Sequence, residues 1–157
     1  MLKQLSLAVL AGLAAATNPG RAKVYNNCPF EVTLWSVGTD ISGPNTLQAR
    51  GGQYSEQYTR DPKTGGRALK ITRERDGLYT GKPQTNFAYT LDPDRIYYDL
   101  SDVFGDPFSG HRVQVVPSNR NCQSIVWPDG RPPAGSQVKT CTRDSDTTLT
   151  LCAAKPA

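Results

Sequence analysis

Residues 24–35 read VYNNCPFEVTLW, and this stretch decides the fold class. A cysteine at position 28 precedes a run in which two sets of side chains alternate. The first set is Phe30, Val32 and Leu34, and the second set is Glu31, Thr33 and Trp35. Because alternate side chains of a strand point to opposite faces, one set is expected to face a core and the other to face away from it. Residues 30–37 are therefore predicted to form a β-strand.

The rest of the chain repeats this pattern in short runs of β-branched and aromatic residues. The runs are separated by clusters of Gly, Pro, Asn and Asp, as at residues 42–45, 61–66 and 128–130. These residue types favour turns, because proline fixes φ and glycine tolerates a positive φ. The pattern predicts an all-β sandwich or barrel of about ten short strands. The expected strands are residues 22–25, 30–37, 53–58, 68–72, 86–91, 95–100, 112–116, 123–127, 137–142 and 147–152.

The N-terminal residues have the features of a signal peptide. Lys3 supplies a positive start, a short apolar run extends from Leu5 to Ala14, and small side chains continue to Ala16. The run is too short to anchor the chain in a bilayer. The sequence thus predicts a signal peptide at residues 1–16. A single secreted domain is expected at residues 17–157, monomeric and without a membrane span.

Cysteine content and charge limit the remaining chemistry. The formal net charge is +4, basic and acidic residues are interspersed, and nucleic-acid binding is not indicated. An even number of cysteines in a secreted chain implies disulfides, and four cysteines allow three pairings. These cysteines are Cys28, Cys122, Cys141 and Cys152. A single histidine, His111, and the lack of any C-x-x-C spacing give no basis for a metal site or a cofactor.

Three segments resemble thaumatin-like proteins: residues 24–35, residues 97–105 (YYDLSDVFG) and residues 149–152 (LTLC). The whole mature chain is similar to a small fungal group, the Blastomyces yeast-phase-specific protein family. The segments that carry this similarity are residues 34–38, 51–56, 68–72, 98–108 and 133–139. The resemblance implies a thaumatin-like β-sandwich of antiparallel strands. It also implies a secreted fungal protein, located in the cell wall, on the conidial surface or at the host interface, and it brings no known catalytic activity.

The resemblance also implies which cysteines are paired. In thaumatin-like proteins an early cysteine bonds to the last one, and this bond ties the first strand to the final strand. Carried over to this chain, the pattern gives Cys28–Cys152 and leaves Cys122–Cys141 as the second disulfide.

Larger thaumatin-like proteins have an acidic cleft, built from one Arg, one Glu and three Asp, that is thought to grip or hydrolyse β-glucan. Only Asp99 lies in a matching motif here, so we expect a non-catalytic module that binds cell-wall polysaccharide or a host surface protein. The residues proposed to form its groove are Asp99, Asp102, Asp106, Tyr98 and Phe108.

The alternative function is that of a weak endo-β-glucanase which uses the acidic cluster around Asp99. Glycoside hydrolysis needs two carboxyl groups at a suitable separation, one of them protonated near neutral pH. The simpler interpretation of Asp102 and Asp106 is turn formation at a strand end, since Gly105 and Pro107 mark a turn. The sequence does not choose the ligand.

Overall fold

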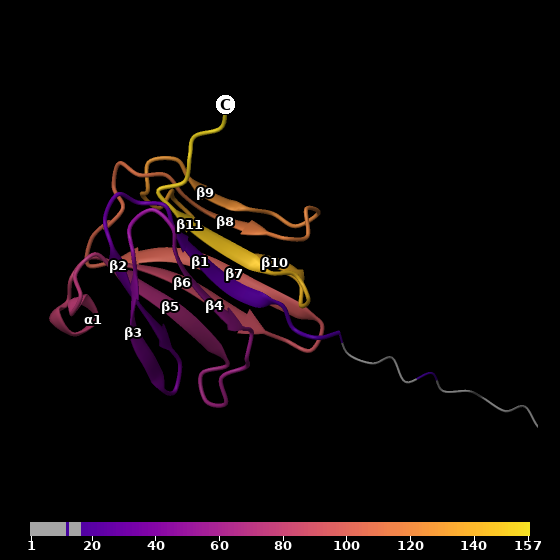
Figure 1. The fold of residues 1–157 in the computed structure, drawn as a ribbon. Helices are drawn as coiled ribbons and strands as arrows, with labels where there is room; N and C mark the ends of the chain where they lie inside the picture. Colours follow the sequence, from indigo (N-terminus) through magenta and orange to yellow (C-terminus); the bar gives the residue numbers. More distant parts are fainter. Residues whose placement is uncertain (1–11, 13–16) are drawn as a thin grey trace, which may run out of the picture.

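The computed structural model describes Gly12 and residues 17–157, and within these residues the chain forms two stacked β-sheets (Figure 1). Apart from Gly12, the predicted signal peptide at residues 1–16 lies outside the described residues. The first sheet has the order β4 (Gly52–Gln57), β1 (Arg21–Asn26), β11 (Thr147–Leu151), β8 (Val113–Pro117) and β9 (Ile125–Trp127). The second sheet has the order β10 (Lys139–Thr142), β7 (Arg95–Val103), β6 (Gln84–Leu91), β5 (Gly66–Thr72), β2 (Val32–Val37) and β3 (Ile41–Leu47).

The core lies between the two sheets and follows the alternation of the sequence. In β7, for example, Ile96, Tyr98 and Leu100 are buried, whereas Tyr97 and Arg95 are exposed. Each fully buried side chain of this size stabilises the fold by about 1.5–3 kcal/mol relative to exposure. The all-β sandwich predicted from the sequence is therefore confirmed.

Neighbouring strands run antiparallel except at one place in the first sheet. There β1 pairs in parallel with β11, with Val24 opposite Leu149, so the first and last strands of the domain lie side by side. The Cys28–Cys152 disulfide joins the segments that directly follow these two strands, across 124 positions of sequence. Cys122 and Cys141, 19 positions apart, form the second disulfide. Both bonds are those that the resemblance implies.

Two elements were not among those predicted from the sequence. Residues 41–47 form the edge strand β3, whose pairing with β2 shifts in register between Leu34 and Ser36. An edge strand tolerates Pro44, because the missing amide proton faces no neighbouring strand. The short helix α1 (Gly77–Thr80) ends at Gly81, which adopts the left-handed conformation that commonly closes a helix. In the part of the chain that the structure describes, no helix is long and apolar enough to cross a membrane.

Candidate functional site

The three aspartates of the predicted groove do not share one surface. Asp99 lies opposite Ala88 and between the buried residues Tyr98 and Leu100, so its side chain belongs to the outer face of the second sheet. Asp102 is three positions further along β7 and faces the other way, where the Thr85 hydroxyl donates a hydrogen bond to its Oδ1 at 2.6 Å. Asp106 follows in the turn after β7. The structure thus brings Asp102 and Asp106 together and leaves Asp99 apart.

The two aromatic residues of the predicted groove belong to the core. Tyr98 is 1% exposed, and its hydroxyl donates to the carbonyl oxygen of Gln123. Phe108 is fully buried and stacks against Phe30, with ring centroids 6.4 Å apart. A polymer at the surface has no access to either ring. Their assignment as ligand contacts is therefore corrected to a core role, since both complete the packing beneath the surface.

A hollow of about 480 Å³ lies at the end of the second sheet where Asp106 is found. We call it the acidic hollow, and its lining residues are Arg73, Glu74, Pro83, Asp106 and Pro107. These residues come from the connection between β5 and β6 and from the turn after β7. The hollow therefore presents two carboxylates and one guanidinium to solvent. Arg73 and Glu74 were not among the residues proposed from the sequence.

Asp102 lies beside this hollow in a partly buried position. Burial raises the pKa of its carboxyl group to about 7, the hydrogen bond from Thr85 opposes the rise, and the nearby Asp106 carboxylate adds to it. Its second oxygen, Oδ2, is buried without a hydrogen-bond partner among the described residues. Asp102 consequently retains a proton at a pH where most carboxyl groups have lost theirs.

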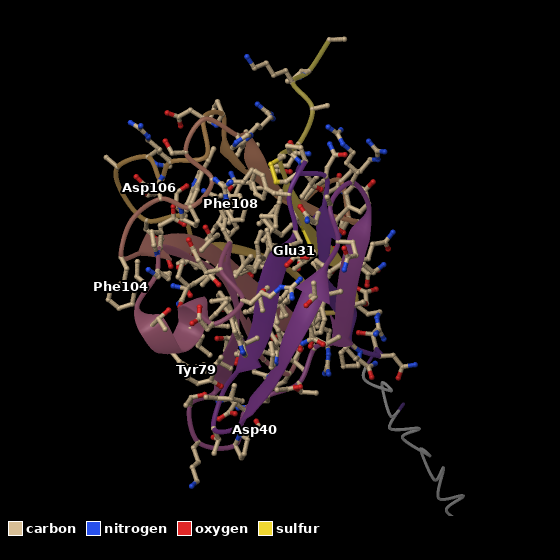
Figure 2. All side chains as sticks on the ribbon, turned by 60° about the vertical axis from the view of Figure 1, so that its left-hand side comes forward. Glu31, Asp40, Tyr79, Phe104, Asp106 and Phe108 are labelled. Carbon is tan, nitrogen blue, oxygen red and sulfur yellow. A yellow bond between two sulfur atoms is a disulfide. The ribbon has the colours of Figure 1, made fainter. Side chains whose placement is uncertain are left out.

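An exposed phenylalanine stands next to the acidic hollow. Phe104 is 70% exposed and has a φ of 60°, a backbone conformation that is strained for a residue with a bulky side chain. The following Gly105 packs against Pro83: a Cβ at Gly105 would lie 3.1 Å from the proline Cγ. Figure 2 shows Phe104, Tyr79 and Asp106 along the same side of the molecule, and Tyr79 is 69% exposed.

Aromatic contacts hold Arg73 at the rim of the hollow. Its guanidinium carbon lies 3.8 Å from the centroid of the Phe30 ring, a cation–π arrangement. The centroid of the His111 imidazole lies 5.5 Å from that of the same ring, in a T-shaped arrangement. Phe30 in turn rests on the buried Phe108. Phe108 therefore supports the site indirectly, because it packs against Phe30, the ring on which the Arg73 guanidinium lies.

A second group of charges lies where the connection between β4 and β5 meets the turn between β2 and β3, and it has a structural explanation. The carboxylate of Asp61 accepts hydrogen bonds from the amide and hydroxyl of Thr39 at 2.7 and 2.6 Å and from the amide of Thr64 at 2.8 Å. These donors hold the pKa of Asp61 well below its usual range. Arg67 donates to Asp40 at 2.9 Å. Because these bonds satisfy the carboxylate and tie a loop to the sheet, the cluster needs no ligand to account for it.

We expect Asp102→Asn to stabilise the protein at alkaline pH. The folded state binds the Asp102 proton more tightly than the unfolded state, so its contribution is complete below about pH 4 and is lost as the pH rises through 7. After solvent screening, removal of the ionisable group should add about 1–2 kcal/mol at pH 8 and almost nothing at pH 3. Thermal unfolding at both pH values measures the difference. Asp99→Asn, on the other face, is the control, and equal changes at both pH values would contradict the expectation.

Comparisons with known proteins identify the relatives of the chain. The sequence pattern of the Blastomyces yeast-phase-specific protein family matches residues 9–153. An antigenic thaumatin-like protein of Arthroderma benhamiae is 30% identical, over 95% of this chain and 81% of the relative. The secreted thaumatin-like protein calA of Emericella nidulans is 28% identical, over 93% of this chain and 91% of the relative. The chain is therefore similar to thaumatin-like proteins along almost its whole length.

Solved structures agree with the sheet architecture. The protein elicitor MoHrip2 of Magnaporthe oryzae superposes with a TM-score of 0.72 at 28% identity, over 85% of this chain and 99% of the other. The thaumatin-like xylanase inhibitor TLXI superposes with a TM-score of 0.57 at 11% identity, over 84% and 99% of the two chains, and this likeness concerns the fold alone. With the two-sheet sandwich and the matched sequence pattern, these findings show that the chain belongs to the Blastomyces yeast-phase-specific protein family, a group of fungal thaumatin-like proteins.

Proposed function

We propose that this is a secreted, non-catalytic protein that binds cell-wall polysaccharide at the acidic hollow. The observation that carries the proposal is Phe104, which is held exposed in a strained backbone conformation two positions before Asp106, one of the residues that line the hollow. Strain of this kind persists only where the surrounding structure imposes it, and it concentrates at ligand-binding sites.

The chemistry of the hollow suits a sugar chain. Sugar rings have apolar C–H faces that stack on an aromatic ring such as Phe104, and amphipathic aromatic residues are favoured at wet interfaces for a similar reason. The hydroxyl groups of the sugar can donate to the carboxylates of Glu74 and Asp106 and accept from the Arg73 guanidinium, and charged partners of this kind make the stronger hydrogen bonds. Tyr79, on the same side of the molecule, is a second exposed aromatic ring.

Secretion is part of the same proposal. The relative from Emericella nidulans is named a secreted protein, and both pairs of cysteines in this chain form disulfides, which persist in oxidising compartments. The predicted cleavage after Ala16 would release a mature chain that begins at Thr17. A protein located at the cell surface or in the cell wall would be in contact with cell-wall polysaccharide.

Phe104→Gly is the variant that tests the binding site. Glycine adopts a φ of 60° without strain, so the change removes the ring while relieving a backbone penalty of about 1–2 kcal/mol. We expect a thermal midpoint at or above that of the parent protein, together with roughly tenfold weaker binding to insoluble β-glucan, the equivalent of about 1.4 kcal/mol. Co-sedimentation with insoluble β-glucan and differential scanning calorimetry measure the two effects.

The matched control for Phe104→Gly is Val116→Ala, which trims an exposed side chain of β8 in the first sheet. This variant should bind like the parent protein. Unchanged binding by Phe104→Gly, or an equal loss in both variants, would remove the basis for placing the sugar at the acidic hollow.

Hydrolysis is a second candidate function, and Asp102 is the observation that favours it. A carboxyl group with a pKa of about 7 next to a second carboxylate has the protonation state of a general acid. Its buried, unpartnered Oδ2 argues against this role, because a general acid must reach the glycosidic oxygen of the substrate. Reducing-sugar release from β-glucan decides between the two functions. Release that falls about a hundredfold in Asp102→Asn would identify an enzyme, whereas the binding function predicts no release by either protein.

A further inference from the structure

A second hollow, of about 420 Å³, lies at the end of the second sheet opposite the acidic hollow. We call it the arginine hollow, and its lining residues are Arg60, Leu91, Asp92, Pro93 and Arg143. The acidic hollow includes Pro83, directly before β6, whereas the arginine hollow includes Leu91, the last residue of β6. Because a strand rises by about 3.4 Å per residue, the length of β6 keeps the two hollows roughly 25 Å apart.

Two arginines from different connections are fixed to the turn between β6 and β7. Arg60 comes from the connection between β4 and β5, and its Nη1 donates to the carbonyl oxygen of Leu91 at 3.2 Å and to Oδ1 of Asp92 at 3.0 Å. Arg143 follows β10, and its Nη1 donates to the carbonyl oxygen of Pro93 at 2.7 Å. Equivalent atoms two residues apart in a chain are at most about 7 Å from each other. The turn therefore holds both guanidinium groups at one hollow.

Each guanidinium keeps donors that the protein does not use. A guanidinium has five N–H donors in one plane, and among the described residues the hydrogen bonds of both arginines come from Nη1 alone. The Nε of Arg143 is buried without a partner in this part of the chain, so its guanidinium is not satisfied by protein groups. Since that Nε is shielded, a ligand would be held by the terminal nitrogens, and the Arg60 side chain is 60% exposed.

The rest of the arginine hollow has an apolar lining. Leu91 is 8% exposed, and Pro93 is a ring of carbon atoms without an amide proton. The methylene stems of the two arginines add to this surface, because long basic side chains lay their stems along apolar groups. The volume is in the range of small-molecule sites. A ligand would therefore meet cationic donors and an apolar wall together.

We propose that the arginine hollow binds a small organic acid with an apolar body. Its carboxylate accepts hydrogen bonds from the terminal nitrogens of Arg60 and Arg143, and its hydrocarbon part packs against Leu91 and Pro93. Guanidinium groups suit this task, because their planar forks match the two oxygens of a carboxylate. The site shares no residue with the acidic hollow and goes beyond the function proposed there.

The charges of the lining favour a monoanion over other occupants. Two guanidinium groups and the Asp92 carboxylate leave one net positive charge, which a single carboxylate neutralises. Asp92 is already bonded to Arg60, and this pairing weakens its repulsion of an incoming anion. A neutral sugar would leave the positive charge uncompensated, and phosphate would gain nothing from the apolar wall. A protein interface uses about 20–30 residues on each side, many more than line this hollow.

The test is an NMR titration of the mature protein with cinnamate and with cinnamamide, its uncharged counterpart. We expect cinnamate to shift the amide signals of residues 59–61, 91–92 and 143–146. Cinnamamide should bind at least tenfold more weakly, because it lacks the charge. Acetate and inorganic phosphate should also bind at least tenfold more weakly than cinnamate, because neither has an apolar body.

Arg60→Gln and Arg143→Gln should each weaken the binding of cinnamate about tenfold. Because the Arg60 side chain is largely exposed, Arg60→Gln should fold like the parent protein and keeps the test valid even if Arg143→Gln is unstable. The matched control is Arg131→Gln, which removes the same charge from an exposed arginine that donates to Ser109, and it should bind like the parent protein. Phe104→Gly should also leave cinnamate binding unchanged, so the result is independent of the acidic hollow.

Several results would overturn the proposal. Equal affinities for cinnamate and cinnamamide would mean that the carboxylate is not recognised. Acetate or phosphate bound as tightly as cinnamate would mean that the apolar wall plays no part. Shifts confined to other residues, no shifts at all, or binding that survives both arginine substitutions would show that the arginine hollow does not hold the acid.

Discussion

Replacement of Cys28 and Cys152 by serine lowers the free energy of unfolding by about 4–5 kcal/mol, according to the entropy of closing a loop this long. The bond spans 124 positions, so its loss restores freedom to almost the whole unfolded domain. In the folded state it joins segments that follow two parallel strands, β1 and β11, and no short turn connects these strands. Cys28 is also fully buried, so the serine hydroxyl would lie in an apolar site.

Urea unfolding measures the effect, and the second disulfide provides the comparison. Cys122→Ser with Cys141→Ser opens a loop of 19 positions and should cost about 3 kcal/mol. The first double variant should therefore unfold at a clearly lower urea concentration than the second. Equal midpoints would mean that loop length does not govern the contribution of these bonds, and that strain or residual structure in the unfolded state does.

The alternation of side chains predicted the sandwich well, because burial on one face of a strand leaves a direct trace in the sequence. Residues 95–100 show this, since Ile96, Tyr98 and Leu100 are buried and Arg95 and Tyr97 are exposed. Residues 32–37 also form a strand, but the expectation that one set of side chains faces away from the core is wrong there, because Thr33 and Trp35 are buried as well as Val32 and Leu34. The strand at residues 41–47 was missed because ISGPNTL reads as a turn when taken alone. Its conformation depends on β2, a partner already fixed by the core, and local propensity does not contain that information.

The candidate site was only partly predictable for a related reason. Asp99 and Asp102 differ by three positions, and an odd separation on a strand places two side chains on opposite faces. That parity was readable in the sequence and would have divided the acidic cluster. Arg73 and Glu74 could not be found in this way, because they come from a different connection and meet Asp106 only through the pairing of β5, β6 and β7.

Which aromatic residues are exposed was also not predicted correctly from the sequence. Tyr97 and Tyr98 are adjacent in the sequence but have different environments. Tyr98 is buried, and its hydroxyl donates a hydrogen bond to a backbone carbonyl, whereas Tyr97 lies on the outer face of the sheet. The alternation of side chains along a strand predicts that the two tyrosines lie on opposite faces. Which of them faces the core depends on the register with β6. The positive φ of Phe104 could not be predicted, because turns place glycine or asparagine in that conformation and the sequence has a phenylalanine directly before Gly105.

Gly130→Ala should destabilise the fold by about 3–5 kcal/mol, through backbone strain and overpacking together. Gly130 has a φ of 76°, and a Cβ there would overlap the carbonyl oxygens of Phe108 and His111 and lie 2.7 Å from the carbonyl carbon of Phe108. These neighbours are backbone atoms and cannot rotate away. The loop after β9 and the loop around residues 108–111 are also joined by a hydrogen bond from Gly110 to Asp129 at 2.7 Å.

Gly135→Ala separates the two causes. Its φ is 90°, and a Cβ there meets nothing within 4 Å, so this variant suffers the strain of the left-handed conformation without the clash and should lose only about 1–2 kcal/mol. Urea unfolding of both variants gives the cost of the contact as their difference. Because displacement of Phe108 would also move Phe30 and the Arg73 guanidinium that rests on it, Gly130→Ala should weaken binding at the acidic hollow while Gly135→Ala does not. Equal losses of stability would show that the two loops separate easily, and unchanged binding by Gly130→Ala would show that the core stack does not hold Arg73 in place.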